Sequence, residues 1–476
     1  MVWLAGIIHR VYDEDESNGA LDWQRARVLS DLSFLTFILT SVERHVYIGI
    51  CSGRVMKSQY EFRDPIHGFI LVNGWEKSVI DHPAFQRLRR IRQLGWTDYV
   101  YPSATHSRFE HSLGVMHVAG RIFDALRDRV KRQLEDWLSY DEAGFLRDRQ
   151  ILRFAALLHD VGHPPFSHAS EDLFQKRYSH EDYSAAIIRN TLKEAIEGDP
   201  ANRNYNIQAD DIADLLLGGI PKTSVLRLFW RSLVAGNLDA DRADYLLRDS
   251  YCTGTAYGRY DLERLVRTIT VALDREGNPV LAVEEGGAHA AEGLVVARYF
   301  MFTQVYFHKT RRAFDYHYLK AMKEILGGKF PAPTSERNLK EYLKWDDWEV
   351  RKRLGDKGGE HGKRLLDRNH YRCVFETTEA PSLRELDKLD QVASKLGRRL
   401  KYRDKAEKSW YKPNKDEILV VRQIGSQQEV RPLSAMSSVI RGLKPVDQQR
   451  LYVERGDCER SLGIVESFVK GKEARK

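Results

Sequence analysis

Apolar residues recur at the spacing of amphipathic helices over much of the chain. In "HPAFQRLRRIRQLG", residues 82–95, an apolar side chain comes at every third position with arginines between, and residues 110–130 continue the pattern. Further helical segments follow, separated by glycine and proline, and a long helical pattern covers about 290–326. These segments predict a mainly α-helical protein.

The segment "DRQILRFAALLHDVGH", residues 148–163, is apolar on nearly every side and therefore predicts a buried helix. We expect Asp148 to cap its N-terminus and the two prolines that follow residue 163 to end it. The last turn of this helix then places His159 and Asp160 in the protein interior.

The pattern changes at both ends of the helical region. Residues 1–55 carry no motif and are treated as an N-terminal extension of unknown role. Residues 56–330 form the expected helical core, which includes a hairpin around Asp274 to Asn278. After "GGKFPAPTSE" a smaller and more charged region, residues 331–476, contains a strand at "DEILVV". The sequence therefore predicts a helical core followed by a small α+β C-terminal lobe.

Charge and cysteine content narrow the class of protein. The 75 Lys and Arg residues exceed the 68 Asp and Glu residues by seven, a mild basic bias that suits nucleotides or nucleic acid without requiring them. The four cysteines are scattered without a CxxC pair, which favours a reducing cytosol over a zinc ribbon. No apolar run reaches the roughly 18 residues of a membrane span, and no secretory leader is evident. We expect a cytoplasmic protein that has no membrane partner.

The stretch "HDVGHPPFSH", residues 159–168, holds three histidines and an aspartate. A divalent metal in a hydrolytic site needs imidazoles, carboxylates and open positions for water and substrate. His159 and Asp160 offer two ligands, and His111 and Asp241 are candidates for two more because they start or flank predicted buried helices. Each has a plainer interpretation when taken alone: a histidine at a helix start is more often a core or capping residue, and "DADRAD" is typical of an acidic helix N-terminus.

The full order H…HD…D on a helical scaffold resembles the HD superfamily of metal-dependent phosphohydrolases. More narrowly, the chain is similar to the deoxynucleoside triphosphate triphosphohydrolases with SAM and HD domains and to their bacterial relatives, although no SAM-like domain is evident in residues 1–55. The resemblance rests on "DPIHGFI", "FQRLRRIRQLG", "SRFEHSLGV", "LLHDVGHPPFSH", "DADRADYLLRD" and "TRRAF", and continues more weakly in "LLDRNHYRCVFE" and "RLYVE". It implies a helical HD-domain core, a divalent metal cofactor and a nucleotide substrate.

The resemblance also implies a role for each matching residue. The implied metal ligands are His111, His159, Asp160 and Asp241. The implied substrate-binding residues are Gln93, Arg108, Arg242, Tyr245 and Asp249. The implied catalytic residues are His163, His168, Glu171 and His180. Two imidazoles and two carboxylates accept Mg, Mn, Fe, Co or Zn, so the sequence leaves the identity of the metal open.

The implied chemistry agrees with what phosphoryl transfer requires, which is mainly the neutralisation of charge. Arg108 would reach the triphosphate, and Arg242 stands where the family has a phosphate-contacting lysine. His180, charged by Glu171, would protonate the departing oxygen. The resemblance further implies that His163 and His168 line the path of the phosphates and that Tyr245 lies under the sugar. Gln93 and Asp249 would contact the 3′-hydroxyl.

The chain departs from the family pattern in "HKTRRAFDYHY". Phe314 and Asp315 stand where better-known members carry a tyrosine and a glutamine near the sugar and base. A phenylalanine still packs against a deoxyribose but offers no hydroxyl, and an aspartate repels phosphate and prefers a base amino group. Base and sugar preference therefore remain open.

Three functions compete at this point. The leading one is hydrolysis of a deoxynucleoside triphosphate to deoxynucleoside and tripolyphosphate. The second is an HD phosphohydrolase that acts on a monophosphate or a signalling nucleotide, and the pair Arg108 and Arg242 favours a polyphosphate over it. The third is a nucleic-acid-binding protein with a relic HD core. Its only support is the basic stretch 396–415, whereas the intact ligand set argues against it.

A regulatory site is a further hypothesis from the resemblance. Asp81, Gln86 and Arg89 match positions where relatives recognise the guanine of an activating nucleotide between subunits. A carboxylate accepts from the guanine N1 and N2 hydrogens, and an arginine donates to O6 and N7. The plainer interpretation is a charged surface helix, and Tyr60 and Arg63 replace a lysine and an asparagine of the family. We therefore expect a homo-oligomer, a tetramer, that responds to a guanine nucleotide.

Overall fold

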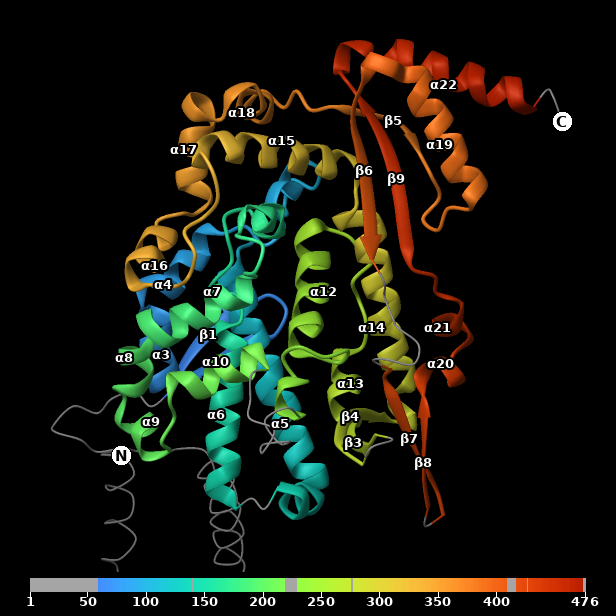
Figure 1. The fold of residues 1–476 in the computed structure, drawn as a ribbon. Coiled ribbons are helices and arrows are strands. Elements are labelled where there is room, and N and C mark those ends of the chain that lie inside the picture. The colour runs from blue at the N-terminus through green and yellow to red at the C-terminus, as the bar shows by residue number, and fades with distance from the viewer. Residues whose placement is uncertain are drawn as a thin grey trace, which may run out of the picture. The chain divides into compact units, whose positions relative to one another are not determined.

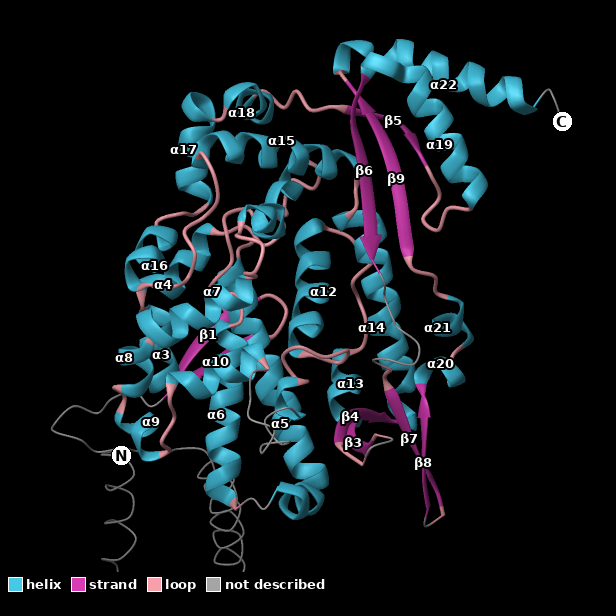
Figure 2. Ribbon diagram, viewed as in Figure 1, coloured by secondary structure: helices cyan, strands magenta, loops and turns pink. Residues whose placement is uncertain are grey.

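The computed structural model describes residues 59–138, 141–218, 229–274, 277–408, 417–425 and 427–473. The chain divides into two compact units, Met1–Gln59 and Tyr60–Lys476. The expected N-terminal extension, residues 1–55, lies outside the described residues. The second unit is mainly helical and has a smaller C-terminal region that contains strands, which confirms the predicted fold class (Figure 2).

The first part of this unit is built mainly of helices (Figure 1). They are α3 (Gly74–Asp81), α4 (Pro83–Gln86), α5 (Arg108–Leu138), α6 (Glu142–Leu158), α7 (His180–Ala186), α8 (Lys193–Glu197), α9 (Pro200–Asn204), α10 (Ala209–Leu217), α12 (Ala240–Thr253), α13 (Leu262–Thr268), α14 (Ala288–Phe300) and α15 (Lys309–Leu326). Helices α16 (Glu336–Leu343), α17 (Asp347–Lys357) and α18 (Gly359–Leu366) follow. A 3₁₀ helix, η4 (Ser167–Leu173), begins seven residues after Asp160.

Helix α6 is the buried centre of this arrangement, as its apolar sequence predicts. It packs along α5 and against α10, and its residues from Ile151 to Leu158 are all buried. The helix begins earlier than expected because Asp141, rather than Asp148, accepts a hydrogen bond from the backbone N–H of Gly144 and caps it. The predicted N-cap at Asp148 is therefore wrong, and Asp148 is a buried residue within the helix.

The apolar positions between residues 82 and 95 belong to 3₁₀ and short helical turns rather than to one α-helix. Helix α4 passes into the 3₁₀ helix η2 (Arg87–Arg90), and a second 3₁₀ helix, η3 (Gly95–Tyr99), follows. A strict spacing of three suits 3₁₀ geometry, which has three residues per turn. The four apolar side chains at this spacing are all buried, namely Phe85, Leu88, Ile91 and Leu94.

The long helical pattern expected over residues 290–326 is divided in the structure. Helix α14 passes into the π-helical segment η7 (Met301–Tyr306), and α15 starts afresh after His308 accepts a hydrogen bond from the backbone N–H of Thr310. Segments of π-helix are rare and are often found at functional sites. Here the segment carries Phe302 and Tyr306 toward α12, where Tyr306 donates a hydrogen bond to Asp249.

The strands form three small sheets. Strands β1 (Gln59–Asp64) and β2 (Gly68–Asn73) pair with each other. The second sheet has the order β3 (Ile269–Leu273), β4 (Pro279–Glu284), β7 (Leu419–Ile424) and β8 (Gln427–Pro432), and only β4 and β7 are parallel. The antiparallel β3–β4 pair confirms the predicted hairpin, and β7 confirms the predicted strand at "DEILVV".

The third sheet is antiparallel in the order β5 (Arg372–Glu376), β9 (Val446–Val453) and β6 (Leu400–Lys408). Helices α19 (Leu383–Leu396) and α22 (Cys458–Glu473) pack on it through an apolar cluster that includes Leu389, Val392 and Leu451. Two short helices, α20 (Leu433–Met436) and α21 (Ser438–Gly442), precede β9. In Figure 1 the antiparallel strands β6 and β9 extend between a region near α19 and α22 and a region near α14.

Strand β6 ties this sheet to the helical core. Asp404, which is fully buried, forms an ion pair with Arg312 of α15, and Ala406 joins the apolar cluster that contains residues of α12 and α14. The end of β6 is therefore fixed beside the helical core. Among the described helices, none is both long enough and apolar enough to cross a membrane.

Candidate active site

The four predicted metal ligands come from three helices that meet in the core. His111 lies in the first turn of α5, His159 is the C-cap of α6, Asp160 follows it, and Asp241 lies in the first turn of α12. His111 and Asp160 are buried, whereas the side chain of Asp241 keeps 34% of its surface exposed. The group is therefore embedded in protein but open to solvent on the side of Asp241.

The ligand atoms of His111, His159 and Asp160 all lie within 4.8 Å of one another, and Asp241 lies next to both imidazoles. The His111 Nε2 atom lies 3.1 Å from Asp241 Oδ1 and 3.6 Å from Asp160 Oδ2. The His159 Nε2 atom lies 3.4 Å from Asp160 Oδ1 and 3.6 Å from Asp241 Oδ1. Ligands about 2.1 Å from a common ion are themselves separated by about 3.0–3.5 Å. The arrangement fits a divalent metal.

Both imidazoles are oriented for metal binding by the hydrogen bonds of their other nitrogen. His159 Nδ1 lies 2.8 Å from the carbonyl oxygen of Ala156, which can only accept, so this nitrogen carries the proton. His111 Nδ1 lies 2.8 Å from a carboxylate oxygen of Asp244. The two Nε2 atoms are buried and have no hydrogen-bond partner among the described residues. Both Nε2 atoms thus face the metal position, and each ring is oriented by the hydrogen bond of its other nitrogen, as is usual for metal-binding histidines.

Asp244 is held in turn by a buried network that sequence inspection missed. Arg248 donates to both of its oxygens at 2.8 Å, and His67 Nε2 lies 2.7 Å from Oδ1. The Arg248 guanidinium also donates to Asp64 at 2.7 Å. Gly114 leaves room for this pairing, because a Cβ there would lie 1.9 Å from Asp244 Oδ1. The i,i+4 spacing of Asp244 and Arg248 in "DADRADYLLRD" was the available sequence signal.

The carboxylates of the group retain negative charge. Burial opposes ionisation, but Arg108 and the neighbouring histidines hold the pKa of Asp160 well below its usual range. His111 and His159 likewise lower the pKa of Asp241. Burial opposes the charging of His111 too, yet Asp241 and Asp244 raise its pKa to about 10 when no metal is bound, so a metal would have to displace the Nε2 proton. A site so rich in anionic character favours a bound cation.

Arg108, the first residue of α5, lies directly beside the metal ligands. Its guanidinium forms an ion pair with Asp160, and its Nε donates to Ser167 Oγ at 2.9 Å. The side chain is almost fully buried. It is therefore placed to meet a negatively charged group that approaches Asp160.

The four predicted catalytic residues form a second cluster next to the first. The rings of His163 and His180 are stacked with centroids 3.9 Å apart, and His163 Nε2 lies 3.2 Å from Asp160 Oδ1. Glu171 Oε1 lies 2.6 Å from His180 Nδ1 and 3.1 Å from His168 Nδ1. The structure thus brings the expected His180–Glu171 pair into direct contact.

The electrostatic surroundings shift the pKa values of the two stacked histidines in opposite directions. Burial lowers the pKa of His163 well below its usual range, with Arg108 and His180 acting in the same direction. Burial also opposes the charging of His180, but Glu171 and Glu181 raise its pKa above the usual value. His180 is therefore the member of the pair that carries a proton more readily.

The loop that carries His163 is fixed by a region that follows the core in sequence. Asp347, at the start of α17, accepts a hydrogen bond from the Phe166 backbone N–H at 2.7 Å. Phe166 and Ser167 both have positive φ angles of 56° and 59°, and the Phe166 ring stacks on Trp96 with centroids 4.4 Å apart. Left-handed backbone at two non-glycine residues is costly and is typical of functional loops.

The residues expected to contact the sugar lie around Asp249 of α12. His106 Nε2 lies 2.8 Å from one oxygen of Asp249, and Tyr306 donates to the other at 2.7 Å. Gln93 is buried nearby, and its backbone N–H donates to the His106 carbonyl oxygen. The Tyr245 ring lies 6.3 Å from that of Tyr306. His106 and Tyr306 were not singled out in the sequence.

Both residues that depart from the family pattern are buried. Phe314 is fully buried in an apolar cluster, where its ring lies 5.0 Å from that of Tyr99 and 4.6 Å from that of His370. Its expected contact with a deoxyribose would require the ring to become exposed. Asp315 is 3.3 Å from Arg311, one turn earlier on α15, so its charge is already paired.

The residues expected to bind an activating nucleotide lie together on the surface. Arg89 Nε donates to Gln86 Oε1 at 2.8 Å, and the Gln86 amide donates to the carbonyl oxygen of Ile80. Asp81, the next residue after Ile80, is exposed and pairs with Lys77. The Arg89 guanidinium covers the ring of Phe109 at 3.5 Å.

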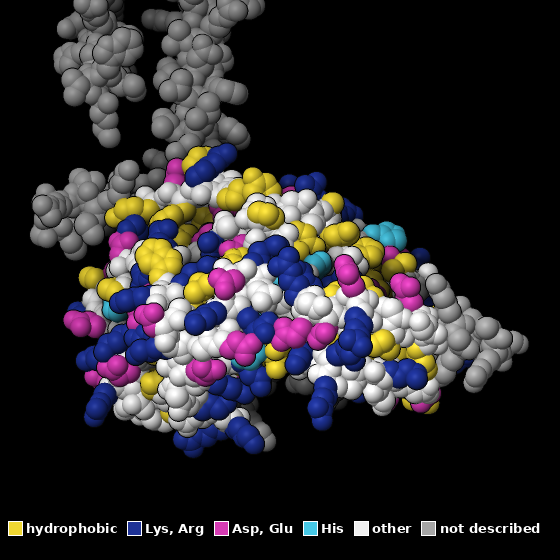
Figure 3. Space-filling model, turned by 90° about the horizontal axis from the view of Figure 1, so that it is seen from above, with side chains coloured by type: hydrophobic (Ala, Val, Ile, Leu, Met, Phe, Trp, Pro, Cys, Tyr) yellow, Lys and Arg dark blue, Asp and Glu magenta, His cyan; other side chains and the backbone are white. Residues whose placement is uncertain are grey.

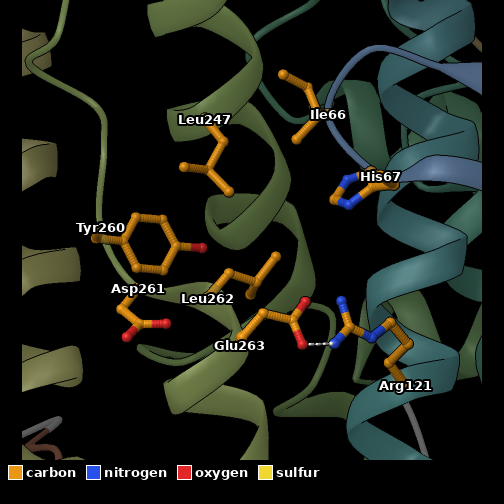
Figure 4. Close-up of a pocket in the computed structure, with 8 residues that line it drawn as sticks. All are labelled: Ile66, His67, Arg121, Leu247, Tyr260, Asp261, Leu262 and Glu263. Atoms are coloured by element: carbon orange, nitrogen blue, oxygen red, sulfur yellow. Dashed lines mark hydrogen bonds and ion pairs between the residues drawn. The ribbon is translucent and has the colours of Figure 1, made fainter.

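A separate cavity of about 290 Å³ borders the Asp244 network rather than the metal ligands. Figure 4 shows it between α12 and α13 on one side and α5 and the β1–β2 turn on the other. His67 projects toward it, and Arg121 and Glu263 form an ion pair at 2.7 Å along its edge (Figure 4). None of the four candidate ligands lines this cavity.

Comparisons with known proteins agree with this geometry. The profile of the HD domain matches residues 108–248, and the profile of the HD-associated region matches residues 260–454. The chain belongs to the HD-domain phosphohydrolase family. All four candidate metal ligands lie within the HD-domain match, and β6 lies within the HD-associated region.

Two solved structures resemble this HD protein over their whole length. A hypothetical protein from Aquifex aeolicus has a TM-score of 0.69 and 30% identity, and the match covers 86% of this chain and 100% of that one. A phosphohydrolase from Bacteroides thetaiotaomicron has a TM-score of 0.64 and 25% identity, covering 83% of this chain and 100% of that one.

Curated relatives match about half of this HD protein. An uncharacterized protein of Methanocaldococcus jannaschii is 38% identical over 264 residues, which cover 55% of this chain and 49% of that protein. The deoxynucleoside triphosphate triphosphohydrolase SAMHD1 homolog of Dictyostelium discoideum is 34% identical over 278 residues, covering 56% of this chain and 50% of that protein. The chain thus spans about half the length of these relatives.

The convergence of the four ligands predicts the effect of removing one. His159→Ala or Asp160→Ala should lower the bound divalent metal severely and abolish turnover, because the loss of one ligand in a set of four weakens binding strongly. The apolar residues of α6 remain, so both variants should fold. Metal content measured by atomic emission after dialysis tests this, with His289→Ala as a control because that histidine is 99% exposed on α14. Full metal content and activity in either variant would contradict the ligand assignment.

Proposed function

We propose that this HD phosphohydrolase hydrolyses deoxynucleoside triphosphates to deoxynucleosides and tripolyphosphate. The observation that carries the proposal is the position of the His180–Glu171 pair, 2.6 Å apart, next to the metal-ligand group and Arg108. A metal position, a cation and a protonated imidazole side by side are the parts that cleavage of a phosphate ester needs. The name of the Dictyostelium relative supports a deoxynucleoside triphosphate as substrate.

In this mechanism the metal would be held by His111, His159, Asp160 and Asp241. When bound it supplies charge neutralisation at a phosphoryl oxygen and a lowered pKa for water. Arg108, freed from Asp160, binds a phosphate oxygen. The Arg242 guanidinium, now 2.8 Å from Asp239, offers a second cation at the start of α12.

Proton transfer falls to His180. Glu171 holds its Nδ1, so Nε2 is the nitrogen that can donate to the 5′-oxygen as the bond from that oxygen to the α-phosphorus breaks. The water molecule supplies the oxygen that remains on the tripolyphosphate. Gln93 and Asp249 are the proposed partners of the sugar 3′-hydroxyl, Tyr245 lies under the ring, and Asp315 is the proposed contact for a base amino group.

Two other functions have weaker support. A monophosphate or a signalling nucleotide would leave the second cation, Arg242, with less to bind. For nucleic acid binding, the basic stretch 396–415 is the only argument, and its described cations are partly paired, with Arg403 to Asp390 and Lys405 to Glu407. Figure 3 shows positive and negative side chains interspersed over the face in view. The free thiols of Cys252, Cys373 and Cys458 suit the proposed cytoplasmic location.

Product identification tests the proposed reaction directly. The purified protein is incubated with each dNTP and NTP in the presence of Mg²⁺ or Mn²⁺, and the products are separated by ion-exchange chromatography. We expect intact tripolyphosphate and a deoxynucleoside in equal amounts. Release of orthophosphate or pyrophosphate, or turnover of monophosphates alone, would contradict the proposal.

The role of His180 predicts separable effects on rate and on metal. His180→Ala should slow turnover by roughly 10²–10⁴-fold, the usual contribution of a general acid, while metal content stays normal. Glu171→Gln should lower the pKa of His180, so the decline of kcat with rising pH should move to lower pH, because the protonated ring is the active form. Loss of metal in His180→Ala, or an unchanged pH profile in Glu171→Gln, would exclude this role.

A guanine-nucleotide activator is part of the proposal. The contact between Arg89 and Gln86 beside Asp81 supports it by gathering a carboxylate, an amide and a guanidinium on one surface. We expect a homotetramer whose formation and activity increase with GTP or dGTP, because an activator must bind the assembled form more tightly. Arg89→Ala should lose the response, whereas Arg132→Ala, an exposed arginine on α5, should keep it. Size-exclusion chromatography with light scattering measures the oligomeric state with and without GTP or dGTP. A monomer in all conditions, together with activity that does not respond to guanine nucleotides, would contradict the hypothesis.

A further inference from the structure

Strand β6 of the C-terminal region points one lysine toward the HD core. Its residues alternate between the two faces of the sheet, and Asp404 and Ala406 are buried while Lys405 and Glu407 are exposed. Asp404 pairs with Arg312, and Ala406 packs in the cluster that contains Leu246 of α12 and Leu294 of α14. Lys408 continues this inward row as the last residue of the strand.

The ammonium group of Lys408 lies at the aromatic surface that leads to the candidate substrate site. Its Nζ is 5.0 Å from the centroid of the Phe302 ring, in the π-helical segment η7. The Phe302 ring is 4.8 Å from that of Tyr306, which donates to Asp249. Phe302 and Tyr306 thus connect Lys408 to the proposed sugar contacts on α12.

Two arginines share this location. Arg298 lies in the last turn of α14, and its guanidinium is 5.8 Å from the centroid of the Phe302 ring. Arg242 is the residue directly after the candidate ligand Asp241. Lys408 and Arg298 thus lie near the same ring, Phe302. The neighbouring Tyr306 ring is 6.3 Å from that of Tyr245, which follows Arg242 by three residues on α12. We call Arg242, Arg298 and Lys408 the cationic wall.

The charge balance of Lys408 is unusual for a lysine. No carboxylate lies within 4.0 Å of its Nζ in the part of the chain that the structure describes. Burial lowers its pKa to about 8, and Arg298 and Arg242 add to this, against a smaller opposite effect of Glu171 and Asp241. A half-buried ammonium among like charges is costly unless an anion offsets it.

We infer that Lys408 is a substrate-binding residue, which the HD-associated region contributes to the active site to hold a phosphate group of a polyphosphate chain. The inference rests on the proposed function for the identity of the substrate but not for the binding of the anion. The ligand class follows from the geometry: three cations beside a metal position suit a chain of two or more phosphates better than a single one. A lysine acts here as a point charge that can follow several phosphate positions.

Binding of inorganic tripolyphosphate tests the inference without turnover. Isothermal titration calorimetry in the presence of Mn²⁺ compares the wild-type chain with Lys408→Gln and Lys408→Arg. Lys408→Gln should weaken binding by roughly 10-fold, which corresponds to about 1.4 kcal/mol. Lys408→Arg keeps the charge and should stay close to the wild type.

The matched control is Lys405→Gln, three residues away on the exposed face of the same strand. It removes the same charge from the same strand end and should leave tripolyphosphate binding unchanged. Equal weakening in both glutamine variants would mean that Lys408 acts only through net charge. Unchanged binding in Lys408→Gln, or no binding by the wild type, would likewise overturn the inference.

Kinetics with a dNTP separate this inference from the proposed reaction. Lys408→Gln should raise KM about 10-fold and leave metal content unchanged. If the wild type releases no tripolyphosphate from any dNTP but Lys408→Gln still loses affinity for inorganic tripolyphosphate, the proposed function fails and Lys408 remains an anion-binding residue. If the wild type is active and Lys408→Gln matches it in KM and in tripolyphosphate affinity, the reaction stands and the inference fails.

Discussion

The buried carboxylate of Asp244 is the constraint on which the rest of the site depends. It sits between Arg248, His67 and His111 and has no exposed surface. An unpaired charge in this position would be strongly destabilising, so these partners stabilise the packed arrangement of the chain. The pairing fixes α12 against α5 and the β1–β2 turn. The same register brings Asp241 and His111 together and gives His111 the tautomer that a metal ligand needs.

A second constraint comes from the region after the HD core. The loop that carries His163 is held by Asp347 through the Phe166 N–H and by Tyr342, which donates to the Gly162 carbonyl oxygen at 2.6 Å. Arg87 spans both parts, since it donates to the carbonyl oxygens of Trp345 and His163. The two segments that the family profiles match separately are therefore one structural unit around the site. By our inference, the same region also binds the substrate directly, through Lys408 at the end of β6.

The sequence was sufficient for the parts of the fold that follow from hydrophobic periodicity and residue order. It predicted the buried helix before His159 and the hairpin around Asp274 to Asn278. It also named His111, His159, Asp160 and Asp241 as candidate ligands, and the structure places these four side chains close together. The capping residues and the type of each helix were harder to predict from the sequence. The choice between Asp141 and Asp148, for example, depends on how far tertiary packing extends α6. Contacts between distant segments carried no local signal. The pairing of Asp244 with His67 and the inward turn of Lys408 follow only from the packed chain.

The central claim is that His111, His159, Asp160 and Asp241 together hold one divalent metal. The most direct test is a crystal grown or soaked with Mn²⁺ and measured by anomalous diffraction. The account predicts one strong anomalous peak about 2.0–2.3 Å from the two Nε2 atoms and from an oxygen of each carboxylate. A single peak among His163, His168, Glu171 and His180 instead, whose donor atoms also lie close enough to share an ion, would contradict it.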